Sequence, residues 1–230
     1  MNSKEYSISA GGSLFFDKNK EISSSFITKI SDFFKNFSDR GYRFHIICGG
    51  GPLARLYIDG ARQAGVTDTQ MLDLLGISMT HINARLLYTA LRARDQKVTY
   101  NHNPYLEEDS IISISGGFGV GHTTDYVAVK IAIMFGLDKI INLTNVEGIY
   151  PQIEGNLDKS RIISEMAWSN FISMKQETHT PGINTPFDPE AAQLAQENNI
   201  TAIILNGHNL LNFSNYLIGN KFIGTIITPF

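Results

Sequence analysis

Three glycine-rich turns are the residues of this chain best suited to chemistry. Gly11-Gly12-Ser13, Gly49-Gly50-Gly51 and the run Gly116-Gly117-Phe118-Gly119-Val120-Gly121 each follow a short apolar segment directly. Glycine lets a ligand approach the backbone, and successive N–H groups ahead of a helix favour phosphate. A single turn is weak support, because tight turns use glycine anyway. Three turns at equivalent strand ends together predict an anion-binding site.

Two familiar phosphate-binding motifs can be compared with these turns. A Walker-type loop requires Gly-Lys followed by Ser or Thr, and the absence of any Gly-Lys pair from the sequence excludes that motif. Gly49-x-Gly51-x-x-Ala54 resembles the dinucleotide-binding variant. However, the acidic residue about twenty positions later, Asp73, lies in a helix-like stretch rather than at a strand end. Dinucleotide binding therefore stays as a weak alternative.

Short apolar strands and longer helix-like stretches must position these turns. The predicted strands hold β-branched or aromatic residues and run into Gly, Asn or Ser; they are Tyr6–Ala10, Tyr42–Cys48, Ile111–Ser115, Lys139–Leu143 and Thr201–Leu205. The clearest helix covers residues 123–136, with Thr123 or Thr124 as its N-cap and Gly136 suited to its C-terminal cap. Pro52 and Asp188-Pro189 indicate two more helix starts. The final β-rich segment, Phe222–Thr228, predicts an edge strand.

The alternation of strands and helices predicts an α/β fold. We expect a three-layer αβα sandwich with a mainly parallel central sheet covered by helices on both faces. With 230 residues, 43% of them hydrophobic, the chain can bury a substantial core. Its net charge of −3 argues against a nucleic-acid or membrane-surface partner, and no apolar run reaches the ~18 residues that span a bilayer. The single Cys48 excludes a disulfide framework and fits a reducing cytoplasm.

In order along nearly the whole chain, these motifs resemble the amino-acid kinase family, and within it the archaeal-type uridylate (UMP) kinases. The resemblance rests on the first two glycine turns, Asp73-Leu74-Leu75-Gly76-Ile77, Thr80-His81-Ile82-Asn83-Ala84, Gly121-His122-Thr123-Thr124-Asp125, Thr144-Asn145-Val146-Glu147-Gly148-Ile149-Tyr150, Asp188-Pro189-Glu190-Ala191-Ala192 and Gly224-Thr225. It implies one domain over 1–230, with an acceptor-binding lobe over about 1–135 and an ATP-binding lobe over about 136–230. It also implies that the γ-phosphoryl group of ATP passes to UMP, with Mg²⁺ carried by the nucleotide phosphates and no dedicated metal ligands in the protein. A cytoplasmic homohexamer acting in pyrimidine biosynthesis is the implied setting.

The resemblance also assigns roles to residues of this sequence. For catalysis it implies Ser13, Arg55 and Asp125, the last as the group that orients a cation. For the acceptor site it implies Gly50, Gly51, Arg55, Asp73, Thr80, His81, Thr123 and Thr124, with Asp73 accepting hydrogen bonds from ribose hydroxyls. For the ATP site it implies Gly11, Gly12, Ser13, Thr144, Asn145, Gly148 and Tyr150. From the residues alone, the favoured interpretation of Asp125 is an acid stabilised in a first helical turn, and Thr123 and Thr124 are ordinary caps.

The sequence departs from the family pattern in its cations. Ser9, Pro52 and the segment 151–155 stand where such kinases commonly bring lysines to the phosphates, His81 stands where they often have arginine, and Glu147 replaces the usual aspartate. Losing one charge-assisted contact of this kind costs on the order of 10²–10³ in rate. Lys18, Lys20, Lys130 and Lys159 are the candidates to substitute in three dimensions. Two alternatives therefore stay open: a catalytically weakened member that binds a nucleotide or another oxyanion for regulation or storage, and a kinase of another acceptor.

Overall fold

A central eight-stranded sheet organises the molecule. The computed structural model describes residues 4–94, 97–105, 110–153, 156–176 and 186–230. The strands lie in the order β3-β4-β2-β1-β5-β9-β10-β8, and β6 and β7 form a separate antiparallel pair. All neighbours in the large sheet are parallel except β9 and β10. The predicted mainly parallel sheet is therefore confirmed.

The elements follow one another as strand and helix units along most of the chain. The strands are β1 (Glu5–Ala10), β2 (Arg43–Cys48), β3 (Val98–Tyr100), β4 (Ile112–Ser115), β5 (Lys139–Thr144), β6 (Gln152–Ile153), β7 (Asn156–Leu157), β8 (Glu165–Ala167), β9 (Thr201–Asn206) and β10 (Thr225–Thr228). The helices are the 3₁₀ turn η1 (Gly12–Phe15), α1 (Ser24–Asp39), α2 (Gly51–Gln63), α3 (Thr69–Arg92), α4 (Thr124–Met134), α5 (Trp168–Gln176), α6 (Pro189–Glu197) and α7 (Leu210–Leu217).

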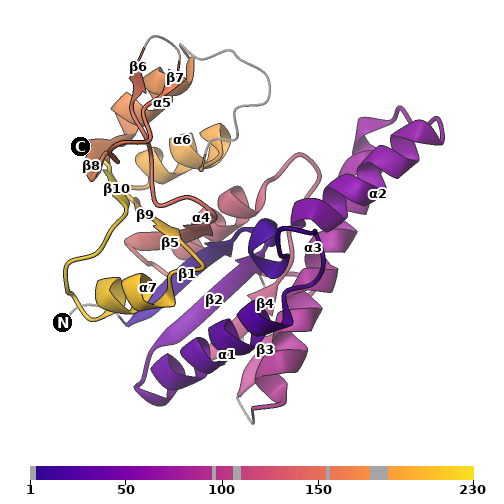
Figure 1. Ribbon diagram of the computed structural model, residues 1–230, viewed down its shortest axis with the longest axis horizontal. Helices are drawn as coiled ribbons and strands as arrows, with labels where there is room; N and C mark the ends of the chain where they lie inside the picture. The colour runs from indigo at the N-terminus through magenta and orange to yellow at the C-terminus, as the bar shows by residue number, and fades with distance from the viewer. Residues whose placement is uncertain (1–3, 95–96, 106–109, 154–155, 177–185) are drawn as a thin grey trace.

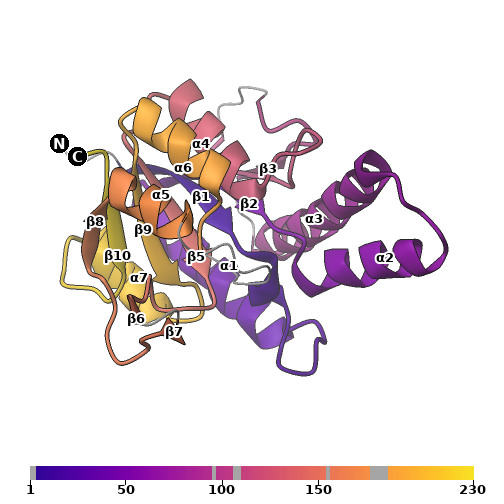
Figure 2. The ribbon, with the colours of Figure 1, turned by 90° about the horizontal axis from the view of Figure 1, so that it is seen from above.

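Helices cover both faces of the sheet, as Figures 1 and 2 show. Helices α1, α3 and α7 cover one face and α4, α5 and α6 the other. Helix α2 packs against α3 and projects away from the sheet with the outer part of α3, and none of its residues is buried. The expected three-layer αβα sandwich is confirmed, with α2 and α3 forming an arm beside it.

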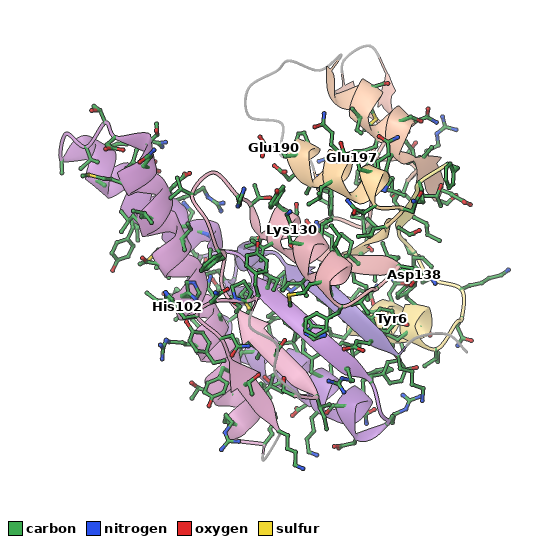
Figure 3. All side chains as sticks on the ribbon, turned by 180° about the vertical axis from the view of Figure 1, so that it is seen from behind. Tyr6, His102, Lys130, Asp138, Glu190 and Glu197 are labelled. Carbon is green, nitrogen blue, oxygen red and sulfur yellow. The ribbon has the colours of Figure 1, made fainter. Side chains whose placement is uncertain are left out.

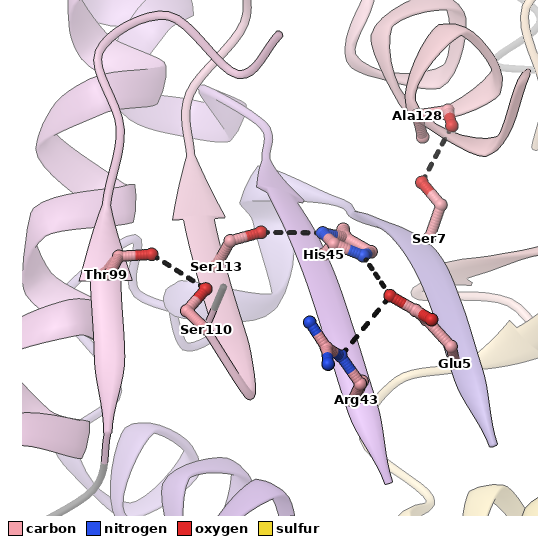
Figure 4. Close-up of polar contacts among 8 residues, drawn as sticks. All are labelled: Glu5, Ser7, Arg43, His45, Thr99, Ser110, Ser113 and Ala128. Atoms are coloured by element: carbon pink, nitrogen blue, oxygen red, sulfur yellow. Dashed lines mark hydrogen bonds and ion pairs between the residues drawn. The ribbon is translucent and has the colours of Figure 1, made fainter. Parts of the chain in front are cut away.

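The strands are buried on both sides because both faces of the sheet are covered, and most but not all of their buried side chains are apolar. Of the six residues in each of β1 and β2, all but the first are buried. Buried polar side chains among them find partners: the imidazole of His45 contacts Glu5 Oε1 and Ser113 Oγ, each at 2.9 Å (Figure 4). The ring also stacks on Phe135 at 4.1 Å. Burial lowers the pKa of His45, and the bond to Glu5 opposes that shift.

The helix starts agree with the sequence prediction, whereas one strand does not. Thr123 caps α4 by accepting a hydrogen bond from the backbone N–H of Tyr126, and Asp188 caps α6 in the same way from Ala191. The expected edge strand is wrong, because β10 lies between β9 and β8. The edge strand is the three-residue β8, which is too short for a periodic apolar pattern to reveal.

Candidate functional site

The first two glycine turns touch each other at the carboxyl edge of the sheet. Gly12 follows β1 and Gly49 follows β2, and these strands are parallel neighbours. A Cβ atom at Gly12 would collide with the backbones of Gly49 and Gly51. Gly51 adopts φ +57° as it opens α2, a conformation that L side chains rarely adopt. Only glycine permits this approach, so the structure brings two of the predicted phosphate turns into one cradle.

Helix α3 fixes the glycine turns with three polar side chains. Asn83 donates from Nδ2 to the carbonyl oxygens of Gly49 at 2.7 Å and Gly50 at 3.2 Å. Asn83 is buried, and it lies three residues after Thr80 on the same helix face. The sequence interpretation gave Asn83 no role, although this spacing from Thr80 is the signal that would have found it.

The other two side chains of α3, those of Thr80 and Asp73, accept hydrogen bonds from the third glycine turn. The backbone N–H of Gly117 donates to Thr80 Oγ1 at 2.7 Å, and that of Gly121 donates to Asp73 Oδ2 at 2.9 Å. Gly119 and Gly121 adopt φ +88° and +81°, so the turn needs glycine at both places. Helix α3 therefore fixes the second and third glycine turns relative to each other.

A cavity of about 280 Å³ lies between these turns. Five of the residues predicted for an acceptor site line it: Gly50, Asp73, Thr80, Thr123 and Thr124. Ala54, Ile58 and Ile77 supply an apolar wall. The cavity thus combines a carboxylate, hydroxyls, the first turn of α4 and an apolar surface, which suits a small ligand with one anionic and one planar apolar part.

Asp125 joins the strands below this cavity to α4 and α6. Its Oδ1 accepts from Ser9 Oγ at 2.6 Å and from Asn142 Nδ2 at 2.9 Å, and its Oδ2 accepts from the backbone N–H of Asp188 at 3.0 Å. Each of these donors is neutral. Ser9, where the family commonly has lysine, therefore keeps a hydrogen bond to Asp125 without bringing a charge.

The residues predicted for ATP lie on the other side of the cradle, beyond β5. The backbone N–H of Gly11 donates to the carbonyl of Leu143 at 2.9 Å, which sets the first glycine turn beside Thr144. Asn145 follows directly. A Cβ at Gly148 would meet Thr225 Oγ1 at 2.7 Å, and that hydroxyl accepts the N–H of Ile149 at 2.8 Å. Tyr150 comes next, at the start of the segment leading to β6.

Another carboxylate accompanies this ATP-side region. Glu147 Oε1 accepts from Asn206 Nδ2 at 2.7 Å, so the end of β9 holds the segment that follows β5. Of the segment 151–155, which lacks the expected lysine, Glu154 and Gly155 lie outside the described residues. The residues predicted for ATP are therefore adjacent in the fold, and Glu147 adds a carboxylate to the segment that follows β5.

His81 lies beneath the third glycine turn and is not among the residues lining the 280 Å³ cavity. Its side chain is buried, with Nδ1 2.8 Å from Tyr100 Oη and the ring stacked 4.2 Å from His102. Burial, and then the neighbouring His102, lower the pKa of His81 to about 4. The residue is neutral at pH 7 and packs against Gly116, where a Cβ would meet its Cγ. In the structure, His81 therefore supports the third glycine turn by packing against it.

The candidate substitute lysines take different places. Lys130 projects from the outer face of α4 (Figure 3), where its Nζ lies 5.7 Å from the centre of the Tyr126 ring. Lys20 lines a separate cavity together with Arg55, next to the cradle. Lys18 and Lys159 are exposed. Arg55 is therefore grouped with Lys20 rather than with the acceptor residues that line the 280 Å³ cavity.

The described part of the chain gives two further negative findings. Asp73 lies within α3, so the strand-end acid that dinucleotide binding would need is not there. No described helix is long and apolar enough to cross a membrane.

Comparison with known proteins agrees with this geometry. The model of the amino acid kinase family matches residues 8–206. A uridylate kinase of Methanobrevibacter smithii is 31% identical over 222 residues, covering 95% of this chain and 96% of that protein. One from Hyperthermus butylicus is 32% identical over 196 residues, covering 82% and 84%. The crystal structure of uridylate kinase from Archaeoglobus fulgidus superposes with a TM-score of 0.77 at 24% identity, covering 96% of this chain and 100% of that one.

Proposed function

The chain belongs to the amino acid kinase family, and from that premise we propose that it transfers the γ-phosphoryl group of ATP to the phosphate of UMP. The observation that carries this proposal is the joined pair of glycine turns, with an acceptor-sized cavity on one side and the ATP-side segments on the other. Its similarity to uridylate kinases supports UMP as the acceptor.

The division of labour follows the two sides of the cradle. We assign acceptor binding to the part over about 1–135 and ATP binding to the part over about 136–230, within one domain of 1–230. Asp73 accepts the ribose hydroxyls of UMP, and Thr123, Thr124 and the first turn of α4 face its phosphate, because helix N-termini favour anions. Gly11, Gly12 and Ser13 lie at the transferred phosphoryl group.

Phosphoryl transfer in this site depends on positioning and charge. An oxygen of the UMP phosphate attacks the γ-phosphorus while the bond to the β,γ-bridging oxygen breaks, and the electron pair leaves with ADP. Backbone N–H groups of the touching turns orient the phosphates. Mg²⁺, bound to the nucleotide phosphates, supplies additional neutralisation of charge. Asp125 keeps β1, β5 and α4 in register beneath the reacting groups through its bonds to Ser9 and Asn142.

We also propose that the chain assembles as a homohexamer in the cytoplasm and supplies pyrimidine nucleotides. Large apolar side chains exposed on the α2–α3 arm support self-association: Leu56, Met71, Leu74 and Ile82 are each about half exposed or more. Light scattering should give a particle about six times the 25.5 kDa of one chain. A particle of one chain mass would contradict the assembly.

Nucleotide turnover tests the proposed reaction. ADP release coupled to a dehydrogenase assay is measured with Mg²⁺, ATP and a panel of nucleoside monophosphates, and UMP should give the highest kcat/KM. No turnover above background with any acceptor would refute the enzyme. The second candidate, a nucleotide-binding member without transfer, is favoured by Ser9 and Pro52 and predicts tight ATP or UTP binding by calorimetry in the absence of turnover.

A further inference from the structure

A second cavity begins where the two touching glycine turns end. It measures about 500 Å³ and lies between the turn after η1 and one side of α2, which lines it from Pro52 to Gln63. Phe16 and Lys20 line one side, and Pro52 and Arg55 line the other. Pro52 directly follows Gly51, whose Cβ position would overlap the backbone of Gly12 and Ser13. The cavity therefore adjoins the place where the first and second turns meet.

The turn that carries Lys20 is held in one conformation. Phe16 and Ile22 pair as an antiparallel bridge at its base. The carboxylate of Asp17 accepts the backbone N–H groups of Asn19 at 2.8 Å and Glu21 at 3.0 Å. Lys20 itself donates its N–H to the carbonyl of Asp17 at 3.0 Å and adopts φ +64°. Glycine would take this left-handed conformation without strain, whereas lysine adopts it at a cost in backbone strain.

The cavity holds two exposed cations, Lys20 and Arg55, and one carboxylate, that of Asp59, which also lines it. Across the described ranges, the side chains of Lys20 and Arg55 make no hydrogen bond or ion pair. Asp59, the acid four residues after Arg55, is 3.4 Å from Arg62 instead. Two unpaired cations that face one cavity beside a phosphate cradle form a site for an anion with several oxygens.

We propose that Lys20 is a catalytic residue that contacts the phosphoryl group during its transfer, with Arg55 as its partner across the cavity. The inference rests on the proposed function, and it supplies the charge that neither Ser9 nor Pro52 can bring. As the bond from the UMP oxygen to the γ-phosphorus forms and the bond to the bridging oxygen of ADP breaks, negative charge gathers on the non-bridging oxygens. The ammonium of Lys20 offsets that charge and exchanges no proton.

Four variants of the full-length chain test this role: Lys20→Ala, Lys20→Gly, Lys20→Arg and, as a matched control, Lys18→Ala. Lys18 is exposed in the same turn and does not line the cavity. We expect Lys20→Ala and Lys20→Gly to lower kcat by about 10²–10³-fold with the KM for UMP changed less than about threefold. Lys20→Arg should recover at least a tenth of the wild-type kcat, and Lys18→Ala should match the wild type.

Lys20→Gly separates a chemical role from a structural one. Because glycine relieves the left-handed backbone, its melting temperature should equal or exceed that of the wild type even though kcat falls. A kcat within threefold of the wild type in Lys20→Gly would overturn the inference. A loss of kcat in Lys20→Ala that Lys20→Gly restores would overturn it too, since only the turn would then matter.

Binding of a bisubstrate analogue distinguishes failure of this inference from failure of the proposed function. The probe is adenosine and uridine joined by a pentaphosphate, measured by calorimetry on each variant. Lys20→Ala should weaken binding at least tenfold even if the wild type shows no turnover, in which case the proposed reaction fails and the anion site stands. Turnover in the wild type with equal affinity and equal kcat in Lys20→Ala would leave the reaction intact and refute the role of Lys20.

Discussion

The two sides of the cradle, which we propose bind the acceptor and ATP, are built in different ways. On the acceptor side, Asn83, Thr80 and Asp73 of α3 each hold a glycine turn through a side-chain hydrogen bond. On the proposed ATP side, backbone contacts such as those of Gly11 with Leu143 and of Gly207 with Thr144 hold the strand ends, and a side-chain bond from Asn206 of β9 to Glu147 holds the segment after β5. One helix thus preorganises the acceptor cavity, whereas the ATP side depends on the sheet itself.

The difference predicts unequal sensitivity to single substitutions. A single substitution removes a side-chain hydrogen bond completely. A misplacement of the reacting groups by about 1 Å can lower the rate by ~10²-fold. A backbone contact survives most changes of side chain. Substitutions on α3 should therefore affect UMP far more than ATP, and the ATP side should have few single side chains that matter.

Asn83→Ala should have the largest effect. It removes both bonds to the second glycine turn and takes the amide partner from the buried carbonyl of Gly49, while the carbonyl of Gly50 keeps the N–H of Ala54. We therefore expect kcat/KM for UMP to fall about 10²-fold and the free energy of unfolding to fall by about 1–3 kcal/mol. Steady-state kinetics and denaturant titration measure the two. Asn198→Ala is the matched control, because its amide makes the same kind of bond to Leu194 at the exposed end of α6. Equal losses in both variants would contradict the role of α3.

Asp73→Ala should raise the KM for UMP by about 10–100-fold, which corresponds to hydrogen bonds of a charged group worth about 1.5–3 kcal/mol. The KM for ATP should stay within about twofold. Asp68→Ser is the control, because serine keeps the N-cap of α3 while removing a carboxylate from the same helix. An unchanged affinity for UMP in Asp73→Ala would remove the assignment of Asp73 to the ribose.

Thr225→Val probes the ATP side, where one buried hydroxyl is an exception to the backbone contacts. Thr225 Oγ1 accepts from Ile149 N and donates to Ile163 O at 2.6 Å, and the side chain is fully buried. Losing it should raise the KM for ATP by about tenfold with little change for UMP. Thr228→Val, three residues along the same strand, should leave both KM values unchanged. A rise in the KM for UMP would show that the two sides are not independent.

The smallest predicted effect concerns pH. The pKa of His81 is lowered from 6.5 to about 4, so between these values the unfolded chain binds a proton that the folded chain does not. Stability contributed by neutral His81 is therefore present above about pH 6.5 and is lost as the pH falls toward 4, by about 2–3 kcal/mol. His81→Gln should flatten this part of the curve of unfolding free energy against pH. A slope unchanged in His81→Gln would show that the ring is solvated.

The sequence predicted the sheet and the cradle better than the supports around them. The strands appear in the sequence as short, mainly apolar segments, and the glycine turns follow them directly. Both the fold and the edge of the sheet that carries the glycine turns could therefore be predicted. Asn83 could have been found from its spacing to Thr80 on the same helix, whereas the bonds to Asp125 join distant segments that no local pattern identifies. The strand β8 was not predicted because its three residues are too few to show a periodic apolar pattern.

The positions of the positively charged side chains could also be predicted only in part from the sequence. Missing lysines at Ser9 and Pro52 were plain in the sequence, but the grouping of Lys20 with Arg55 depends on how the turn after η1 meets α2. His81 was expected at the acceptor. Its burial beside Tyr100 and His102 comes from the packing of α3 against β3, which the sequence did not predict. At the amino edge of the sheet, Tyr6 and Asp138 lie far from this site (Figure 3).

The product formed from UMP tests the central claim most directly. Wild-type chain is mixed with Mg²⁺, ATP and UMP, and the phosphorus resonances of all nucleotides are followed by NMR. We predict that UDP and ADP appear in equal amounts, that inorganic phosphate does not accumulate and that omission of UMP stops the release of ADP. ADP accompanied by inorganic phosphate without UDP, or no change in any resonance, would contradict the proposed transfer.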